Sequence, residues 1–375
     1  KHARLRIHLV HRWCLPKEPA VLIIIFQNIQ CDKNMESKNL KHSTINLGHG
    51  SGGIMTRDLL DDIIFTTFDN PLLNKKHDGA IVKFDTEMAV STDSFVVSPI
   101  FFKGGNIGEL AVNGTVNDVA MCGAMPKYLS LAFIVEEGLK VEDFIAIVNS
   151  IKKAADDSGV QIITGDTKVV ERGKGDKIFI NTTGFGEVNP KAKIASEHIK
   201  NGDKILLNGF VAQHGMAIMS QREGLEFEST IVSDTTNLNF LVNDLINEFG
   251  DKIHLFRDPT RGGVASVLSE ISQDIHTGVV IYEDKIPLEK QVAAACEILG
   301  LDPLYVANEG VFMVIVDASI CDDVLNFMKK DPKGKNATYI GEITQEHPGK
   351  VIMKSAIGGK RIVSPLIGEQ LPRIC

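Results

Sequence analysis

The stretch IGELAVNGTVNDVAMCG (residues 107–123), followed by YLSLAFIV (128–135) and VEDFIAIVNSIKKAADDSG (141–159), alternates two chemical patterns. The first and third segments repeat apolar residues at helical spacing and end in glycine, which predicts helices that stop at Gly123 and Gly159. The segment between them is a short apolar run typical of a buried strand. Helix, strand and helix in this order predict a layered fold in which helices cover a sheet.

The same alternation continues on both sides of this stretch. Further strands are expected at residues 88–97, 177–188, 204–210, 278–284 and 310–317, and further helices at 236–250 and 262–275. A polar, turn-forming stretch at 189–203 separates two such halves. We therefore expect an N-terminal α/β domain over 35–195, a C-terminal α+β domain over 196–363, and an extended tail over 364–375.

The composition excludes several classes of protein. The chain has 375 residues, of which 43% are apolar and 23% are charged, and its net charge is −8. This usage is typical of globular domains and excludes disordered, collagen-like and coiled-coil chains. The acidic balance disfavours nucleic acid and anionic membrane surfaces as partners. Six scattered cysteines without a CxxC pair indicate neither a disulfide framework nor a zinc site, so we expect a reducing, cytoplasmic compartment.

Residues 1–34 differ from the rest of the chain. They hold the single tryptophan, no methionine, and an apolar run, VLIIIF (21–26), that follows basic residues. That run resembles part of a signal peptide, but no small-residue cleavage site follows it and it is too short to span a membrane. We expect an extension that the fold does not need, with a processed targeting segment as the alternative.

A glycine-rich loop precedes a helical pattern that begins near Ile54. Its six residues are Gly48, His49, Gly50, Ser51, Gly52 and Gly53. Glycine lets backbone amides approach phosphate oxygens, and the dipole of a following helix favours an anion at its N-terminus. The spacing matches neither a P-loop nor a dinucleotide fingerprint. The loop is therefore a candidate phosphate site, with a flexible surface loop as the alternative.

Four aspartates stand at expected element ends, each beside small residues: Asp93, Asp118, Asp166 and Asp258. Magnesium prefers carboxylate oxygens together with substrate phosphates, so carboxylates that converge from separate elements suit a Mg-ATP site. The segment DPTRGGV (258–264) adds a helix N-terminus as a further anion site. Each aspartate taken alone is better explained as a cap or a solvated residue, and only the four together favour the Mg-ATP site.

Two polar turns beside apolar strands carry Lys168 and Glu309, which are a possible acid and base. Surface salt bridges are the alternative. The chain ends in PRIC, so Cys375 terminates a tail whose dozen residues would reach roughly 40 Å when extended. Arg373 or a cationic pocket would favour the thiolate form of Cys375. An accidental exposed thiol is the alternative there.

Seven motifs together resemble the HypE family of hydrogenase maturation factors. They are INLGHGSGG (45–53), STDSFVVSP (91–99), TVNDVAMCGAMP (115–126), TGDTKVV (164–170), DPTRGGV (258–264), NEG (308–310) and the terminal PRIC. This family is related to aminoimidazole ribonucleotide synthetase, selenophosphate synthetase and thiamine-monophosphate kinase, all of which use ATP. The resemblance implies an N-terminal domain whose sheet pairs across a homodimer, a C-terminal α+β domain, and ATP bound in a cleft on the dimer side.

The resemblance also implies a reaction. In that family, HypF carbamoylates the terminal cysteine, and the HypE protein dehydrates the thiocarbamate with ATP to an S-thiocyanate, whose cyanide passes through HypC and HypD to hydrogenase iron. Here the acceptor would be Cys375, with Glu309 as preferred base and Lys168 as its electrostatic partner, or the reverse. Mg²⁺ would be held by Asp93, Asp118 and Asp258. ATP would contact the glycine-rich loop (Gly48, His49, Gly50, Ser51, Gly52, Gly53) and Asn117, Asp166 and Arg261.

Two other functions remain open on the sequence alone. An ATP-using relative could act on a free small molecule, although such an enzyme would not need a terminal PRIC. Selenophosphate chemistry is disfavoured because Cys31 precedes the glycine-rich loop by 17 residues, within the N-terminal extension. A non-catalytic scaffold, docking through Cys375, is the alternative from a different class.

Overall fold

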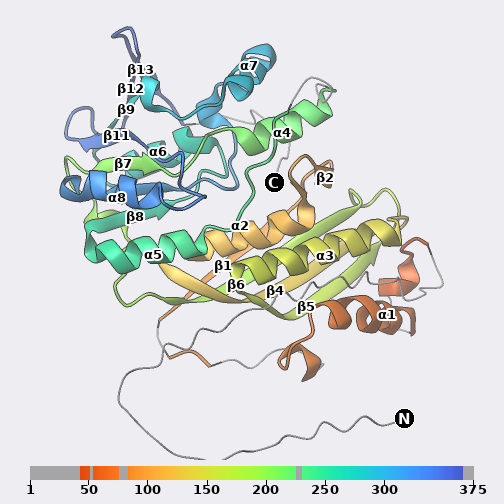
Figure 1. The fold of residues 1–375 in the computed structure, drawn as a ribbon. Helices are drawn as coiled ribbons and strands as arrows, with labels where there is room; N and C mark the ends of the chain where they lie inside the picture. Colours follow the sequence, from red (N-terminus) through yellow and green to blue (C-terminus); the bar gives the residue numbers. More distant parts are fainter. Residues whose placement is uncertain (1–42, 51–53, 76–82, 86, 225–229, 366–375) are drawn as a thin grey trace, which may run out of the picture. The chain divides into compact units, whose positions relative to one another are not determined.

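The computed structural model describes residues 43–50, 54–75, 83–85, 87–224 and 230–365. All of them fall within one compact unit that spans Leu40–Cys375. The ribbon in Figure 1 shows mixed helices and strands, as the sequence predicts. No helix in the described ranges is long and apolar enough to cross a bilayer.

A four-stranded sheet forms the first half of this unit. Its order is β1 (Met88–Phe95), β6 (Ile178–Val188), β4 (Ala124–Glu136) and β5 (Gln161–Val170). Helices α2 (Ile107–Met121) and α3 (Val141–Ser158) pack against it, and α2 contacts β1, β4 and β6 (Figure 1). The predicted stop at Gly159 is confirmed, because this residue caps α3 in a left-handed conformation with φ 73°.

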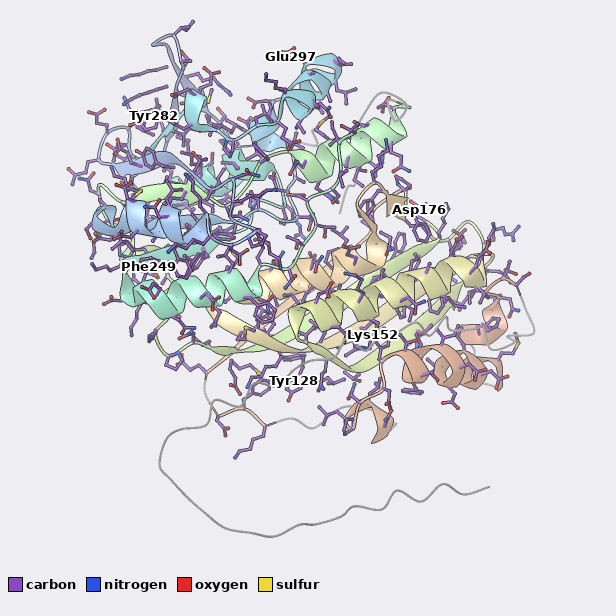
Figure 2. The ribbon with its side chains drawn as sticks, viewed as in Figure 1. Tyr128, Lys152, Asp176, Phe249, Tyr282 and Glu297 are labelled. Atoms are coloured by element: carbon purple, nitrogen blue, oxygen red, sulfur yellow. The ribbon has the colours of Figure 1, made fainter. Side chains whose placement is uncertain are left out.

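Alternation along the strands gives this sheet two different faces. Leu131, Phe133 and their neighbours two residues away on β4 are buried, and Phe133 packs edge-on against Phe144 of α3. Ile134, which points the other way, is 45% exposed, and Val90 of β1 is 50% exposed. Charged residues occupy the outer face of α3, where Lys152 pairs with Asp156 (Figure 2). These helices therefore cover one face, and among the described residues Ile134 and Val90 stay exposed on the other, which we call the open face.

A seven-stranded sheet forms the second half. Its order is β13 (Lys360–Val363), β12 (Val351–Lys354), β9 (Gly278–Tyr282), β11 (Thr338–Thr344), β7 (Lys204–Leu207), β10 (Met313–Val316) and β8 (Ile253–Arg257). Ile205 and Leu207 share a core with α6 (Gly263–Asp274). Leu206 shares another core with α5 (Asn239–Phe249) and α8 (Cys321–Met328). Strands that are apolar on both faces thus bring helices to both faces.

Shorter elements complete the fold. The 3₁₀ segment η1 (Leu47–Gly50) lies against β5, and α1 (Ile54–Leu59), η2 (Leu60–Phe65) and η3 (Leu73–Lys75) follow it. The hairpin of β2 (Phe101–Phe102) and β3 (Gly105–Asn106) leads into α2. Helices α4 (Gln213–Arg222) and α7 (Lys290–Leu299) pack on each other in the second half. A helix beginning at Ile54 is confirmed.

Two expectations about local structure are wrong. The segment around Asp166 and Lys168 is not a turn, because both residues lie within β5. Asp93 lies within β1 and Asp118 within α2, rather than at element ends. Only Asp258 follows the end of a strand, β8. Asp166 and Lys168 lie on an exposed strand face, where polar residues resemble a turn in the sequence.

Candidate functional site

An acidic cluster forms where the two halves of the compact unit meet. β1 carries Asp93, α2 carries Asp118, and the turn after β8 carries Asp258. Ser91 donates its hydroxyl to Asp118 Oδ2 at 2.8 Å, and Arg261 pairs with Asp93 at 2.6 Å. The structure therefore brings together the three predicted metal residues and the predicted phosphate-binding arginine.

The electrostatics of this cluster indicate a shortage of positive charge. Burial, followed by the charge of Asp258, raises the pKa of Asp118 to about 7. Burial also raises the pKa of Asp258, whose carboxyl can share a proton with that of Asp118 and whose buried Oδ2 otherwise has no hydrogen-bond partner. Within the described ranges no three His, Cys, Asp or Glu side chains are arranged to enclose a metal by themselves. The cluster thus fits a hydrated Mg²⁺ that takes its remaining ligands from nucleotide phosphates.

Glu309 belongs to the same cluster. It lies between the 3₁₀ segment η8 (Pro303–Tyr305) and β10, and it is only 3% exposed. Burial, with the negative charge of Asp234 and Asp258 next, raises the pKa of Glu309 well above its usual range. The carboxyl lies beside α2: a Cβ built on Gly114 would be in ordinary van der Waals contact with Glu309 Oε2, at 3.7 Å, while it would crowd the ring of Phe95 at 2.9 Å. A carboxyl with a raised pKa is the kind of group that acts as a general base.

A second group of predicted residues gathers at β5. Lys168 pairs with Asp166 at 2.9 Å, and both side chains are largely exposed. The same segment of β5 borders an apolar pocket of about 260 Å³ on the covered face, whose walls come from η2, η3, β4 and β5 and include Ile64, Phe65, Leu131 and Phe133, while the side chains of Asp166 and Lys168 point to the other face. The start of the glycine-rich loop, in η1, lies against the same strand. His49 is buried there, with its Nδ1 3.1 Å from the backbone nitrogen of Asn46.

The register of the sheet shows that the acidic cluster and the predicted residues on β5 lie far from each other within one chain. Along one row, Asp93 lies across from Thr182, Thr182 from Leu131, and Leu131 from Gly165. Asp93 points toward α2, whereas Asp166, the next residue after Gly165, points to the open face. Three strand spacings, or about 14 Å, separate β1 from β5.

Lys168 is likewise far from Glu309 within one chain. It lies across from the exposed Ile134 on the open face, at the opposite edge of the sheet from β1. Glu309 lies beside α2, on the covered face. The structure therefore does not bring the predicted acid and base together within one chain.

Comparison with known proteins identifies the family. Residues 76–188 match the AIR synthase related protein family, N-terminal domain, and residues 200–354 match its C-terminal domain. Carbamoyl dehydratase HypE of Bradyrhizobium diazoefficiens is 47% identical over 340 residues, which is 90% of this chain and 98% of that protein. The chain belongs to the HypE family of carbamoyl dehydratases. The predicted resemblance, the two-part α/β fold and the expectation of an enzyme of this family are confirmed.

Solved structures of HypE proteins agree with this assignment. A crystal structure of HypE in complex with ATP superposes with a TM-score of 0.85 and 45% identity, over 88% of this chain and 99% of that one. A HypE–HypF complex matches with a TM-score of 0.72 and 44% identity, over 82% of this chain and 99% of that one. These structures thus show a HypE protein with ATP bound and a HypE protein in complex with HypF.

Four predicted site residues of this HypE family member lie outside the described residues: Ser51, Gly52, Gly53 and Cys375. Asn117 lies within the described residues, and its side chain forms hydrogen bonds to other parts of the protein. It donates to the carbonyls of Thr236 and Glu309 at 2.9 and 3.2 Å and accepts from the amide of Leu238 at 2.7 Å. Asn117 is therefore better explained as a support for Glu309 than as a contact to ATP.

Sequence reasoning missed Asp234. This residue lies between α4 and α5, 75 positions before Glu309, and its carboxyl oxygens accept the amide N–H of Glu309 at 3.2 and 3.3 Å. Burial raises its pKa to about 6, against the opposing effect of backbone N–H groups around it. The surrounding letters, VSDTTN, carry no periodic or spacing signal that singles out this aspartate.

Proposed function

We propose that this chain uses ATP to dehydrate a carboxamide carried on the sulfur of Cys375, forming an S-thiocyanate. That group would supply the cyanide ligand of the iron in a [NiFe]-hydrogenase. The observation that supports this function most directly is the buried Glu309 carboxyl, which lies among other carboxyls in a chain of the carbamoyl dehydratase family. A buried carboxyl of raised pKa is suited to taking a proton from nitrogen.

The chemistry requires that an amide lose its oxygen. The carbamoyl oxygen attacks the γ-phosphorus of ATP, ADP leaves, and one N–H proton is lost, which gives an S-bound imidate phosphate. The second N–H proton is then removed while the C–O bond breaks and phosphate departs, leaving C≡N on sulfur. The balance is thiocarbamate plus ATP to thiocyanate, ADP, phosphate and one proton. Phosphorylation matters because phosphate is a far better leaving group than oxide or hydroxide.

Each residue group has a proposed part in these steps. Glu309 takes the N–H protons, and the ammonium of Lys168 stabilises negative charge on the carbamoyl oxygen or the phosphate; the two roles can also be exchanged. Arg261 and the glycine-rich amides bind phosphate oxygens. Asp93, Asp118 and Asp258 would hold Mg²⁺, which when bound neutralises charge on the triphosphate. The apolar pocket beside Asp166 suits a purine base.

We also propose a homodimer formed through the open face of the four-stranded sheet. This face exposes Met88, Val90 and Ile134, and large exposed apolar side chains on a sheet face favour association. Lys168 and Asp166 of one subunit would then face the partner. Because Glu309 lies beside α2 on the covered face, a site that takes Lys168 from one chain and Glu309 from the other would have to form around an edge of the partner's sheet.

The proposed partners follow from the same reaction. HypF, seen with a HypE protein in a crystal structure, would carbamoylate Cys375, and HypC with HypD would receive the cyanide. The free thiols of Cys122, Cys296 and Cys321 suit a reducing, cytoplasmic setting. We retain 35–195, 196–363 and 364–375 as the proposed two domains and reactive tail.

The test separates carbamoyl transfer from dehydration. The chain is first carbamoylated with HypF and carbamoyl phosphate, then freed of HypF and nucleotide, and finally given Mg-ATP. Mass spectrometry of the peptide ending at Cys375 should show carbamoyl addition and then ATP-dependent loss of one water. A Cys375→Ala chain should show neither mass change.

Other outcomes would point to other functions. ATP turnover that is independent of Cys375 would favour a relative that acts on a free small molecule. Carbamoylation without any ATP-dependent loss of water would favour a scaffold that only carries the modified tail. Either result would contradict the dehydratase function.

A further inference from the structure

The loop that bears Glu309 is held by side chains from several distant segments. Asn308 accepts the amide of Ala212 at 2.6 Å and donates to the carbonyls of Pro259 and Val306 at 3.1 and 2.9 Å. Asn208 donates to the carbonyl of Gly310 at 3.1 Å. With Asn117 on the carbonyl of Glu309, these asparagines fix the backbone on both sides of the carboxyl.

Asp234 completes this arrangement at the amide of Glu309 itself. Both of its carboxyl oxygens accept that N–H, and the amides of Gly310 and His214 also face the carboxyl. Three converging donors suit a carboxylate and not an asparagine, because asparagine has one acceptor oxygen and an NH₂ group that would meet a donor. The requirement for an acid here thus follows from the loop geometry.

The backbone of the Asp234 segment approaches the same loop closely. A Cβ built on Gly310 would lie 1.9 Å from the carbonyl oxygen of Asp234, so no other residue fits at this position without displacing one of the two segments. Asp234 and Glu309 are also two carboxyls side by side, which disfavours their simultaneous ionisation. A contact that costs stability in this way, at the residue proposed as base, indicates a functional requirement.

We infer that Asp234 is a positioning residue for the dehydration step, holding the backbone of Glu309 so that its carboxyl faces the reacting group. This inference rests on the proposed function. Asp234 itself does not touch substrate: it acts through Glu309. A shift of about 1 Å in a reacting group costs about 10²-fold in rate, which sets the scale of the effect.

The experiment combines Asp234→Asn with Glu309→Gln in a double-mutant cycle on the carbamoylated chain. Asp234→Asn should lower kcat for ATP-dependent dehydration about 10- to 100-fold, with KM for ATP and carbamoylation by HypF unchanged within about twofold. In the Glu309→Gln background, Asp234→Asn should cause no further loss, because the residue it positions is already gone. Asp317→Asn is the matched control, since Asp317 accepts a backbone amide, that of Ser319 at 2.9 Å, at the other end of β10.

Hydrogen exchange provides a readout that does not depend on activity. The amides of residues 309 and 310 should exchange faster in Asp234→Asn, whereas Glu309→Gln and Asp317→Asn should leave them at the wild-type rate. If Asp234→Asn does not fold, Asp234→Glu replaces it, because it keeps the charge and displaces it by one methylene. A kcat within twofold of wild type, or losses that multiply in the double variant, would overturn the inference. A wild-type chain that never dehydrates its carbamoylated tail would instead overturn the proposed function, and the exchange result would still report on the contact.

Discussion

Replacing Asp118 by asparagine should stabilise the nucleotide-free protein at neutral and alkaline pH. The pKa of Asp118 is raised from 3.8 to about 7 in the fold, a change of about 3 pH units, and each unit corresponds to about 1.4 kcal/mol. The upper limit is therefore about 4 kcal/mol, and about 2 kcal/mol is expected because Asp118 and Asp258 share the effect. Asparagine can still accept the Ser91 hydroxyl, so that hydrogen bond, 2.8 Å in the native chain, is kept.

The pH dependence identifies the cause of this stabilisation. A carboxyl whose pKa is higher in the folded state costs nothing below about pH 4, and its cost grows as the pH rises toward 7. Thermal unfolding in EDTA should thus show Asp118→Asn melting several degrees above wild type at pH 8 and level with it at pH 4. The exposed Asp244→Asn on α5 is the control and should show no difference at either pH. A gain of equal size at both pH values, or none at pH 8, would refute the electrostatic reasoning.

Three further variants test other parts of the site. Glu309→Gln should lower the dehydration rate about 10²- to 10⁴-fold and raise Tm at pH 8, because it removes a buried carboxyl of raised pKa; single-turnover rates and melting curves measure the two effects. A purified heterodimer of Lys168→Ala and Glu309→Gln subunits should keep about half the wild-type rate if each site draws on both chains, and an inactive heterodimer would disprove that sharing. Gly310→Ala should abolish dehydration and lower Tm, since its Cβ would lie 1.9 Å from the Asp234 carbonyl oxygen; a fully active variant would show that the loop relaxes.

The parts of the fold that the sequence predicts best are its long apolar segments. α3 buries one face and α2 is buried on nearly all sides, and the predicted ends of both helices agree with the structure to within two residues. β5 was missed as a strand because Asp166 and Lys168 occupy its open face at a sheet edge. Polar residues are tolerated there, and in the sequence they look like a turn.

The candidate site was only partly predictable for a related reason. Asp93, Asp118, Asp258 and Glu309 stand in distinctive motifs, and the structure brings them together. Asp234 acts through hydrogen bonds to a loop 75 residues away, and no local pattern encodes such a contact. The separation of Lys168 from Glu309 follows from the register of the sheet. Register depends on which strands pair, and the spacing of motifs along the sequence does not reveal it.

The crowding of carboxyls has a consequence for the binding of the nucleotide. Asp93 and Asp118 come from the first half of the unit, whereas Asp234, Asp258 and Glu309 come from the second. Their mutual repulsion opposes close approach of the halves, and a cation that arrives with the nucleotide relieves it. The Mg-ATP proposed for this site should thus strengthen the contact between the two halves around Glu309, whose loop Asn117 and Asp234 already hold.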